Sequence, residues 1–137
     1  MELLVVLAII GILSSVGVPS YNKFVEQGRF SQATNDLYNA YRFARSEAIK
    51  TSSPMTLKPK TVSDWSDGWE VVNSGNDILL EVKKPHASIE VSGAEITVFG
   101  RGSINIAGFT FLTVSSASRT SSICVLESGQ SKKGACI

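Results

Sequence analysis

The sequence predicts an α+β protein in which one long N-terminal α-helix packs on antiparallel β-sheets. The residues before Pro54 show helix-type spacing of apolar side chains. The residues after it form short runs rich in β-branched and aromatic side chains, separated by turn residues. Hydrophobic residues make up 43% of the 137 positions, and the apolar excess lies in the first twenty. This composition predicts one domain preceded by an anchor.

The first segment, residues 1–22, is predicted to be a hydrophobic helix that anchors the chain in a membrane. No residue from Leu3 to Asn22 is charged, which matches the roughly 20 residues that cross a bilayer. A cleaved signal peptide is one alternative, but such peptides begin with basic residues, and here Glu2 leads. A buried core helix is the other, although soluble cores rarely hold so long an apolar run. Because a charge at bilayer depth costs roughly 2.5–3.5 kcal/mol, Glu2 is expected to serve a function.

Residues 23–53 are predicted to continue the same helix as an amphipathic segment that reaches the globular domain. Thr51–Pro54 marks its end, because proline disfavours helical geometry in the residue before it. The whole helix would then be on the order of 70 Å long. Gly11, Gly17 and Pro19 are expected to bend or loosen it. Its packed face is predicted from apolar or small residues at three- and four-residue spacing: Phe30, Ala33, Leu37, Ala40, Tyr41, Ala44, Ala48 and Ile49.

Residues 54–137 are predicted to form a β-rich globular domain with a C-terminal disulfide loop. Turn signals such as Asp67-Gly68 and Ser128-Gly129 separate the runs. Their spacing resembles that of hairpins, so antiparallel sheets are expected to lie on the helix. The expected strands are Met55–Lys58, Gly68–Val72, Ile78–Val82, Ile89–Val91, Glu95–Phe99, Phe109–Val114 and Ser122–Leu126.

Cys124 and Cys136 are the only cysteines, and a bond between them would close a loop of about a dozen residues. Such a disulfide would indicate an oxidising compartment. Two unrelated buried thiols are the alternative. Zinc is disfavoured, because His86 and two cysteines supply fewer than the usual four ligands. No metal site is predicted.

The run Glu2–Leu13, followed by Val18-Pro19-Ser20-Tyr21, resembles the N-terminus of type IV pilins and type II secretion pseudopilins. The resemblance implies that Glu2 meets the N-terminal amine of a neighbouring subunit, and that Glu2 and Pro19 belong to a subunit-assembly site. In that family, prepilin peptidase removes a short basic leader. Only Met1 precedes Glu2, so we expect this sequence to lack the leader, the cleavage site and about three mature residues.

Three further stretches resemble the GspH/FimT group of minor pilins and minor pseudopilins: Tyr41–Lys50, Pro54–Leu57 and Asp64–Trp69. The resemblance implies a pilin-like fold and a minor pilin in a priming or tip complex, serving pilus biogenesis, twitching motility or DNA uptake. A minor pseudopilin of a type II secretion system is an alternative. The implied partners are other minor pilins or pseudopilins, the major pilin and, before assembly, the inner membrane of a Gram-negative bacterium. The globular domain would face the periplasm.

A DNA receptor for natural transformation is the second alternative. Some members of the group bind DNA through arginines after a glycine turn. Here Lys132 and Lys133 occupy that stretch, and lysines contact phosphates only as point charges. The net charge of +1 gives no general argument for nucleic acid.

Enzymatic function is not predicted. Gly100-Arg101-Gly102 lacks the spacing of a phosphate-binding loop, and His86 has no evident catalytic partner. Asp64, Asp67 and Asp77 fall short of calcium-loop spacing. We therefore expect no catalytic residue, cofactor or small-molecule substrate.

Overall fold

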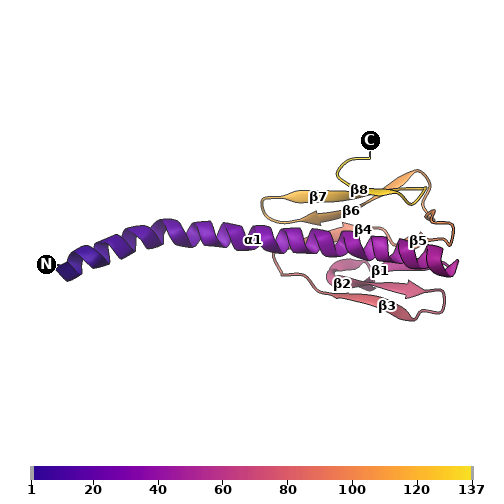
Figure 1. Cartoon of the computed structure of the whole chain (residues 1–137), viewed down its shortest axis with the longest axis horizontal. Coiled ribbons are helices and arrows are strands. Elements are labelled where there is room, and N and C mark those ends of the chain that lie inside the picture. The colour runs from indigo at the N-terminus through magenta and orange to yellow at the C-terminus, as the bar shows by residue number, and fades with distance from the viewer. Residues whose placement is uncertain (1, 137) are drawn as a thin grey trace.

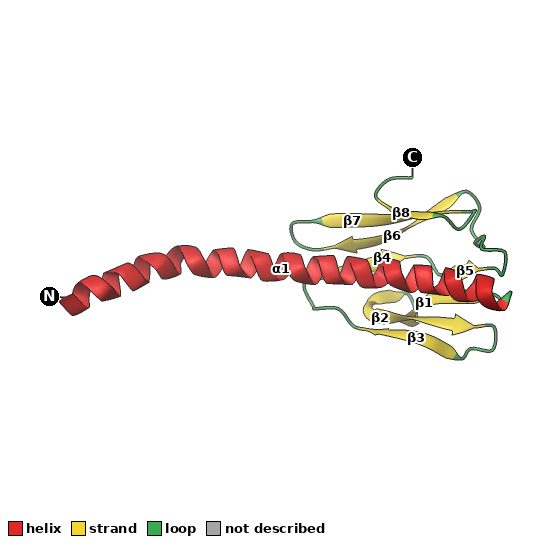
Figure 2. Ribbon diagram, viewed as in Figure 1, coloured by secondary structure: helices red, strands yellow, loops and turns green. Residues whose placement is uncertain are grey.

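The computed structural model describes residues 2–136. One long helix, α1, is followed by eight short strands in this part of the chain (Figure 2). The elements are α1 (Glu2–Thr51), β1 (Met55–Thr61), β2 (Asp64–Asn73), β3 (Ile78–Lys83), β4 (Glu90–Gly93), β5 (Ile96–Val98), β6 (Phe109–Ser115), β7 (Thr120–Leu126) and β8 (Ser131–Lys133). The predicted α+β class is confirmed.

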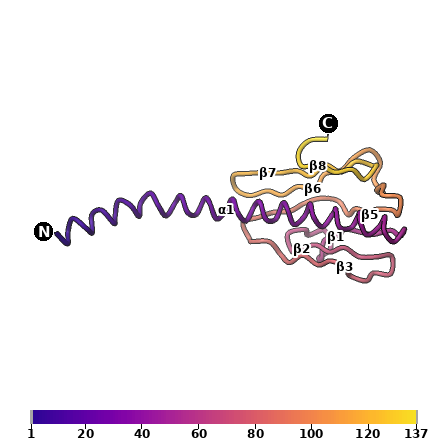
Figure 3. The backbone as a smooth tube through the Cα atoms, in the orientation of Figure 1, coloured from indigo at the N-terminus to yellow at the C-terminus, as the bar shows by residue number. Residues whose placement is uncertain are grey.

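The strands form two four-stranded sheets, and every pair is antiparallel. The first sheet has the order β3-β2-β1-β5 and the second β4-β6-β7-β8. The C-terminal half of α1 runs along both sheets and contacts β1, β2, β3, β5 and β6, whereas its N-terminal half extends beyond them (Figures 1 and 3). The molecule is therefore a rod with a β-rich body on one half.

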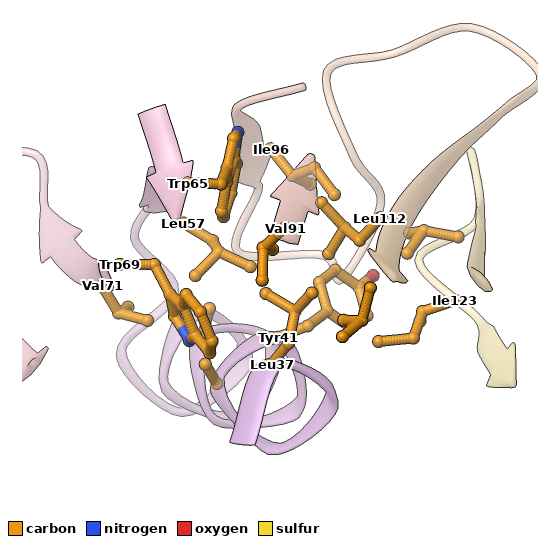
Figure 4. Close-up of a cluster of buried hydrophobic side chains, with 14 of the residues drawn as sticks. Leu37, Tyr41, Leu57, Trp65, Trp69, Val71, Val91, Ile96, Leu112 and Ile123 are labelled. Atoms are coloured by element: carbon orange, nitrogen blue, oxygen red, sulfur yellow. The ribbon is translucent and has the colours of Figure 1, made fainter. Parts of the chain in front are cut away.

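The core lies between α1 and the inner faces of both sheets. In Figure 4, Leu37 and Tyr41 of α1 meet Leu57 of the first sheet and Leu112 and Ile123 of the second. All five side chains are 0% exposed. The alanines on the packed face of α1 let the strands approach the helix closely. The predicted helix face is therefore confirmed, with one exception.

That exception is Ile49, which the spacing placed on the packed face but which is 48% exposed. Each helical residue turns about 100°, so Ile49 follows Ala48 onto a different side of α1. It lies at the edge of the body, where Gly102 packs against its side chain.

The end of α1 matches the prediction, and its geometry explains why. Ser52 has a φ of 52°, and its amide donates to the Ile49 carbonyl. The Ser53 amide donates to the Ala48 carbonyl at 3.2 Å. These two bonds form a Schellman motif, in which glycine usually occupies the left-handed position. Pro54 follows directly and prevents the helix from continuing.

Two strand predictions need correction. The expected turn at Asp67-Gly68 is wrong: Gly68 lies inside β2 with a φ of 102°, and the pairing of β1 with β2 is irregular between Pro59 and Thr61. At this irregularity β2 forms a bulge, because it has more residues than the facing part of β1. The bulge brings Trp65 into the core, where its indole nitrogen donates to the Gly93 carbonyl at 2.9 Å. The sequence also failed to predict β8, which contains no β-branched or aromatic residue.

Candidate assembly site

The N-terminal half of α1 is uncovered. Every residue from Glu2 to Phe24 is exposed. Its large apolar side chains, including Leu3 at 74% and Phe24 at 75%, lie on all sides of the helix. The segment is long and apolar enough to cross a membrane, and its most apolar stretch is entirely unburied. Such a surface indicates contact with lipid or with other apolar helices.

Glu2 and Pro19 both lie on this uncovered half. Glu2 occupies the first turn, where the helix dipole favours a negative charge. Pro19 lies inside α1, and the helix continues through it without a break. The two residues are separated by about 25 Å along the helix axis. They are therefore part of one exposed rod and do not form a compact site.

A groove of about 910 Å³ lies where α1 enters the body, between its residues 21–30 and the loop that joins β6 to β7. Its floor is the helix, including Phe30, and its wall contains Ser116 and Arg119. Glu26 lines the groove and has one buried carboxylate oxygen with no hydrogen-bond partner among the described residues. The other oxygen accepts from the Ser88 hydroxyl at 3.0 Å. The groove adjoins the exposed half of α1, and its lining combines apolar side chains such as Phe30 with charged ones.

Cys124 and Cys136 form a disulfide with a Cα–Cα distance of 5.4 Å. Cys124 lies on β7, and the loop closed by the bond contains β8, which pairs with β7. The bond therefore ties the end of the described chain across an edge strand of the second sheet.

Lys132 and Lys133 are adjacent on β8 but lie on opposite faces of the sheet, because side chains alternate along a strand. Lys132 is the register partner of Cys124, and Lys133 that of the buried Ile123. The Lys133 ammonium lies 5.3 Å from the centre of the Tyr38 ring and donates to the Asn35 side chain. The structure thus does not bring the two lysines together into one basic patch.

Tyr41, which the sequence placed on the packed face of the helix, connects α1 to the β7–β8 turn. Its hydroxyl donates to the Gly129 carbonyl at 2.7 Å, and burial raises its pKa to about 12. Gly129 has a φ of 80° and lies directly against the Gly102 carbonyl, so that a Cβ would collide with it. Arg45 Nε donates to the same Gly102 carbonyl at 3.4 Å. The helix thereby holds the loop at Gly102 against the turn at Gly129. In the sequence, only the Ser128-Gly129 turn signal indicated part of this contact.

The polar side chains named above as catalytic or metal-binding candidates form hydrogen bonds with their neighbours in the body. The His86 Nδ1 atom lies 2.9 Å from the Ser88 hydroxyl and 3.5 Å from Arg29, so His86 helps dock the β3–β4 connection on α1. A hydrogen bond from the Thr61 hydroxyl lowers the pKa of Asp67, and Lys84 adds to this effect. Asp77 accepts from the Asn73 side chain. Within residues 2–136, no group of three His, Cys, Asp or Glu side chains is placed to hold a metal ion.

Comparison with known proteins relates this fold to pilus and secretion proteins. The family of the type II transport protein GspH matches residues 33–129. A crystal structure of the type IV minor pilin FimU from Pseudomonas aeruginosa superposes with a TM-score of 0.70 at 14% identity, covering 82% of this chain and 92% of that one. A second FimU crystal form gives a TM-score of 0.63 at 14% identity, with 77% and 92% covered. No curated protein sequence matches the chain. The family match covers most of the body, and the chain therefore belongs to the GspH family of minor pilins and pseudopilins, with a pilin fold.

Proposed function

We propose that this chain is a minor pilin that joins the priming or tip complex of a type IV pilus. The observation that carries the proposal is the uncovered apolar half of α1, which continues without a break into the body. Burying each large apolar side chain is worth roughly 1.5–3 kcal/mol, so the segment must leave water. The inner membrane would hold it before assembly, and a bundle of neighbouring helices would hold it in the filament.

Glu2 would set the stagger of this helix against its neighbour. Its carboxylate begins an otherwise uncharged surface, and the N-terminal amine of the adjacent subunit is its proposed partner. Leaving a buried charge without its partner costs about 3–5 kcal/mol, so a wrong register would be strongly disfavoured. Pro19 lies on the same uncovered surface and would pack within the same bundle.

The test is replacement of Glu2 by Ala in the natural precursor, followed by immunoblotting of membranes and of sheared pili. Membrane levels should stay unchanged, while incorporation into pili should fall at least tenfold, since ~1.4 kcal/mol already gives a factor of ten. Glu95→Ala is the matched control, because Glu95 is exposed on the body and far from α1 in sequence. Normal incorporation of Glu2→Ala would refute the assigned role.

A minor pseudopilin of a type II secretion system is the alternative that the family name supports. Both assemblies would use the same anchor and the same periplasmic body, and the disulfide suits an oxidising compartment in either case. Deleting the gene separates them: loss of surface pili supports the pilus, and loss of secreted enzymes with normal piliation supports the pseudopilus.

The remaining alternative is a DNA receptor, and the opposite orientation of Lys132 and Lys133 weakens it. A gel-shift titration at low and moderate salt, comparing the unchanged chain with Lys132→Ala and Lys133→Ala, is the direct test. Phosphate contacts make affinity fall steeply with salt. If DNA does not bind even at low salt, this alternative is eliminated.

A further inference from the structure

A basic groove lies on the body between α1 and the β7–β8 turn, apart from the exposed half of the helix. It has a volume of about 630 Å³. Its lining is Tyr38, Arg42, Arg45, Ser46, Ile49, Gln130 and Ser131.

Two arginines, Arg42 and Arg45, line this groove, and Lys133 lies beside it against the ring of Tyr38. The Arg42 guanidinium lies 5.7 Å from the centre of the Tyr38 ring, and the Lys133 ammonium lies 5.3 Å from the same centre. Arg45 follows Arg42 by three residues and lines the groove beside it. Its Nε donates to the Gly102 carbonyl, and no hydrogen bond among the described residues uses its two terminal nitrogens. The groove thus presents donors that suit an anion.

No carboxylate lines the groove. Within residues 2–136, the ion pairs use Arg29, Lys50, Lys58, Lys60 and Lys84, and none involves Arg42, Arg45 or Lys133. Neighbouring cations repel one another, and a bound anion would relieve that repulsion. The charge of this groove therefore lacks a counterpart within the described part of the chain.

The groove is held in shape before any partner arrives. The Tyr41 hydroxyl bonds the Gly129 carbonyl at 2.7 Å, directly before Gln130 and Ser131. The Tyr38 hydroxyl donates to the Ser131 carbonyl at 3.4 Å. Because the β7–β8 turn is fixed to α1 at two points, little ordering cost remains for binding.

We propose that this groove binds an acidic segment of a neighbouring pilin subunit, so that Arg42, Arg45 and Lys133 form a second assembly contact. The partner class rests on the proposed function, and the charge supplies the complementarity. An arginine fork fits a carboxylate in a bidentate manner, and Ile49, which is 48% exposed, offers apolar contact to a flanking side chain.

A nucleic acid is the less favourable occupant. Duplex DNA carries one charge per about 1.7 Å and requires an extended basic surface. The Tyr38–Arg45 stretch spans only about 10 Å along the helix. The net charge of the chain is only +1.

The first test measures binding of a fluorescein-labelled hexaglutamate peptide to the full chain in detergent micelles by fluorescence anisotropy. Arg42→Glu and Lys133→Glu should each weaken binding about tenfold, and salt should weaken binding to the unchanged chain. Lys83→Glu is the control, because it makes the same charge change at an exposed residue of β3, in the other sheet. Thermal melting by circular dichroism verifies that each variant folds. Absence of binding, or equal weakening by Lys83→Glu, overturns the proposal, as does tighter binding of an oligothymidine of equal charge.

The second test identifies the partner in cells. A photo-cross-linking residue at the exposed Ser46 should capture another pilin subunit through a peptide that contains Asp or Glu, and Arg42→Glu should abolish the cross-link. A cross-link that survives Arg42→Glu, or none in assembled filaments, overturns the assembly contact. If Glu2→Ala shows that the chain does not assemble in this way, the peptide titration still decides whether the groove binds carboxylates.

Discussion

Replacing Tyr41 by Phe should destabilise the body through a single atom. The side chain is 0% exposed, and its hydroxyl donates to the carbonyl of the buried Gly129 at 2.7 Å. The ring of Phe fills the same space, so the change removes a hydrogen bond without creating a large cavity. The Gly129 carbonyl would lose its hydrogen-bond donor, and Gly102 packs directly against Gly129 on its other side. Leaving a buried acceptor unsatisfied costs about 1–3 kcal/mol.

The assay is thermal and urea unfolding followed by near-ultraviolet circular dichroism. Tyr38→Phe is the control, because its hydroxyl makes a longer, half-buried bond of 3.4 Å to Ser131 and should cost less than about 1 kcal/mol. The pH dependence adds a second readout. Burial raises the folded pKa of Tyr41 to about 12, so the neutral phenol is favoured by folding. Its contribution is full below the unfolded pKa of ~10 and is lost as pH rises toward 12.

The difference in stability between the unchanged chain and Tyr41→Phe should therefore be constant below pH ~10 and narrow as pH rises from there toward 12. Equal stability of the two proteins at neutral pH would show that the Tyr41–Gly129 bond does not hold the turn.

Two further changes test the ends of the body. Ser52→Gly should raise the free energy of unfolding by about 0.5–1 kcal/mol, because Ser52 has a φ of 52° at the helix C-terminus. Ser53→Gly should lower it by a similar ~0.5 kcal/mol, and a loss in both variants would contradict the assigned cap. Replacing Cys124 and Cys136 by Ser should cost about 3 kcal/mol, as expected for a 12-residue loop. Unfolding in denaturant measures this loss, and a midpoint insensitive to reductant in the unchanged chain would argue against the bond.

The helix and most strands were predictable because their signals are local. The spacing from Phe30 to Ala48 identifies the packed face without knowledge of the partner strands. Pro54 marks the end of α1 for the same reason. By contrast, β8 exists because β7 offers an open edge and the disulfide holds Ser131–Lys133 beside it. The bulge in β2 likewise depends on the burial of Trp65 and on its hydrogen bond to Gly93. Neither feature can be predicted from the residues of the strand alone.

The basic groove also depends on contacts between residues that are distant in the sequence, so the sequence did not predict it. Lys132 and Lys133 are adjacent in the sequence and suggest one patch, but the pleat of β8 separates them. Lys133 instead joins Arg42, which lies 91 residues earlier, across the ring of Tyr38. Only the register of β8 and its position along α1 bring these charges together. A pattern of residues that are adjacent in the sequence cannot reveal such a site.

Because α1 is continuous, the two proposed contacts, at Glu2 and at the basic groove, would act together on the position of a neighbouring subunit. Arg42 lies 40 residues beyond Glu2 on one unbroken helix, which places the groove about 60 Å from the carboxylate. Glu2 alone would fix the axial position of a subunit but leave its rotation about the helix free. A second charged contact on one side of the body would fix that rotation. A slip of one helical turn would displace the groove by about 5.4 Å from its acidic partner. The two contacts together would therefore select a neighbour whose own charges have the same separation.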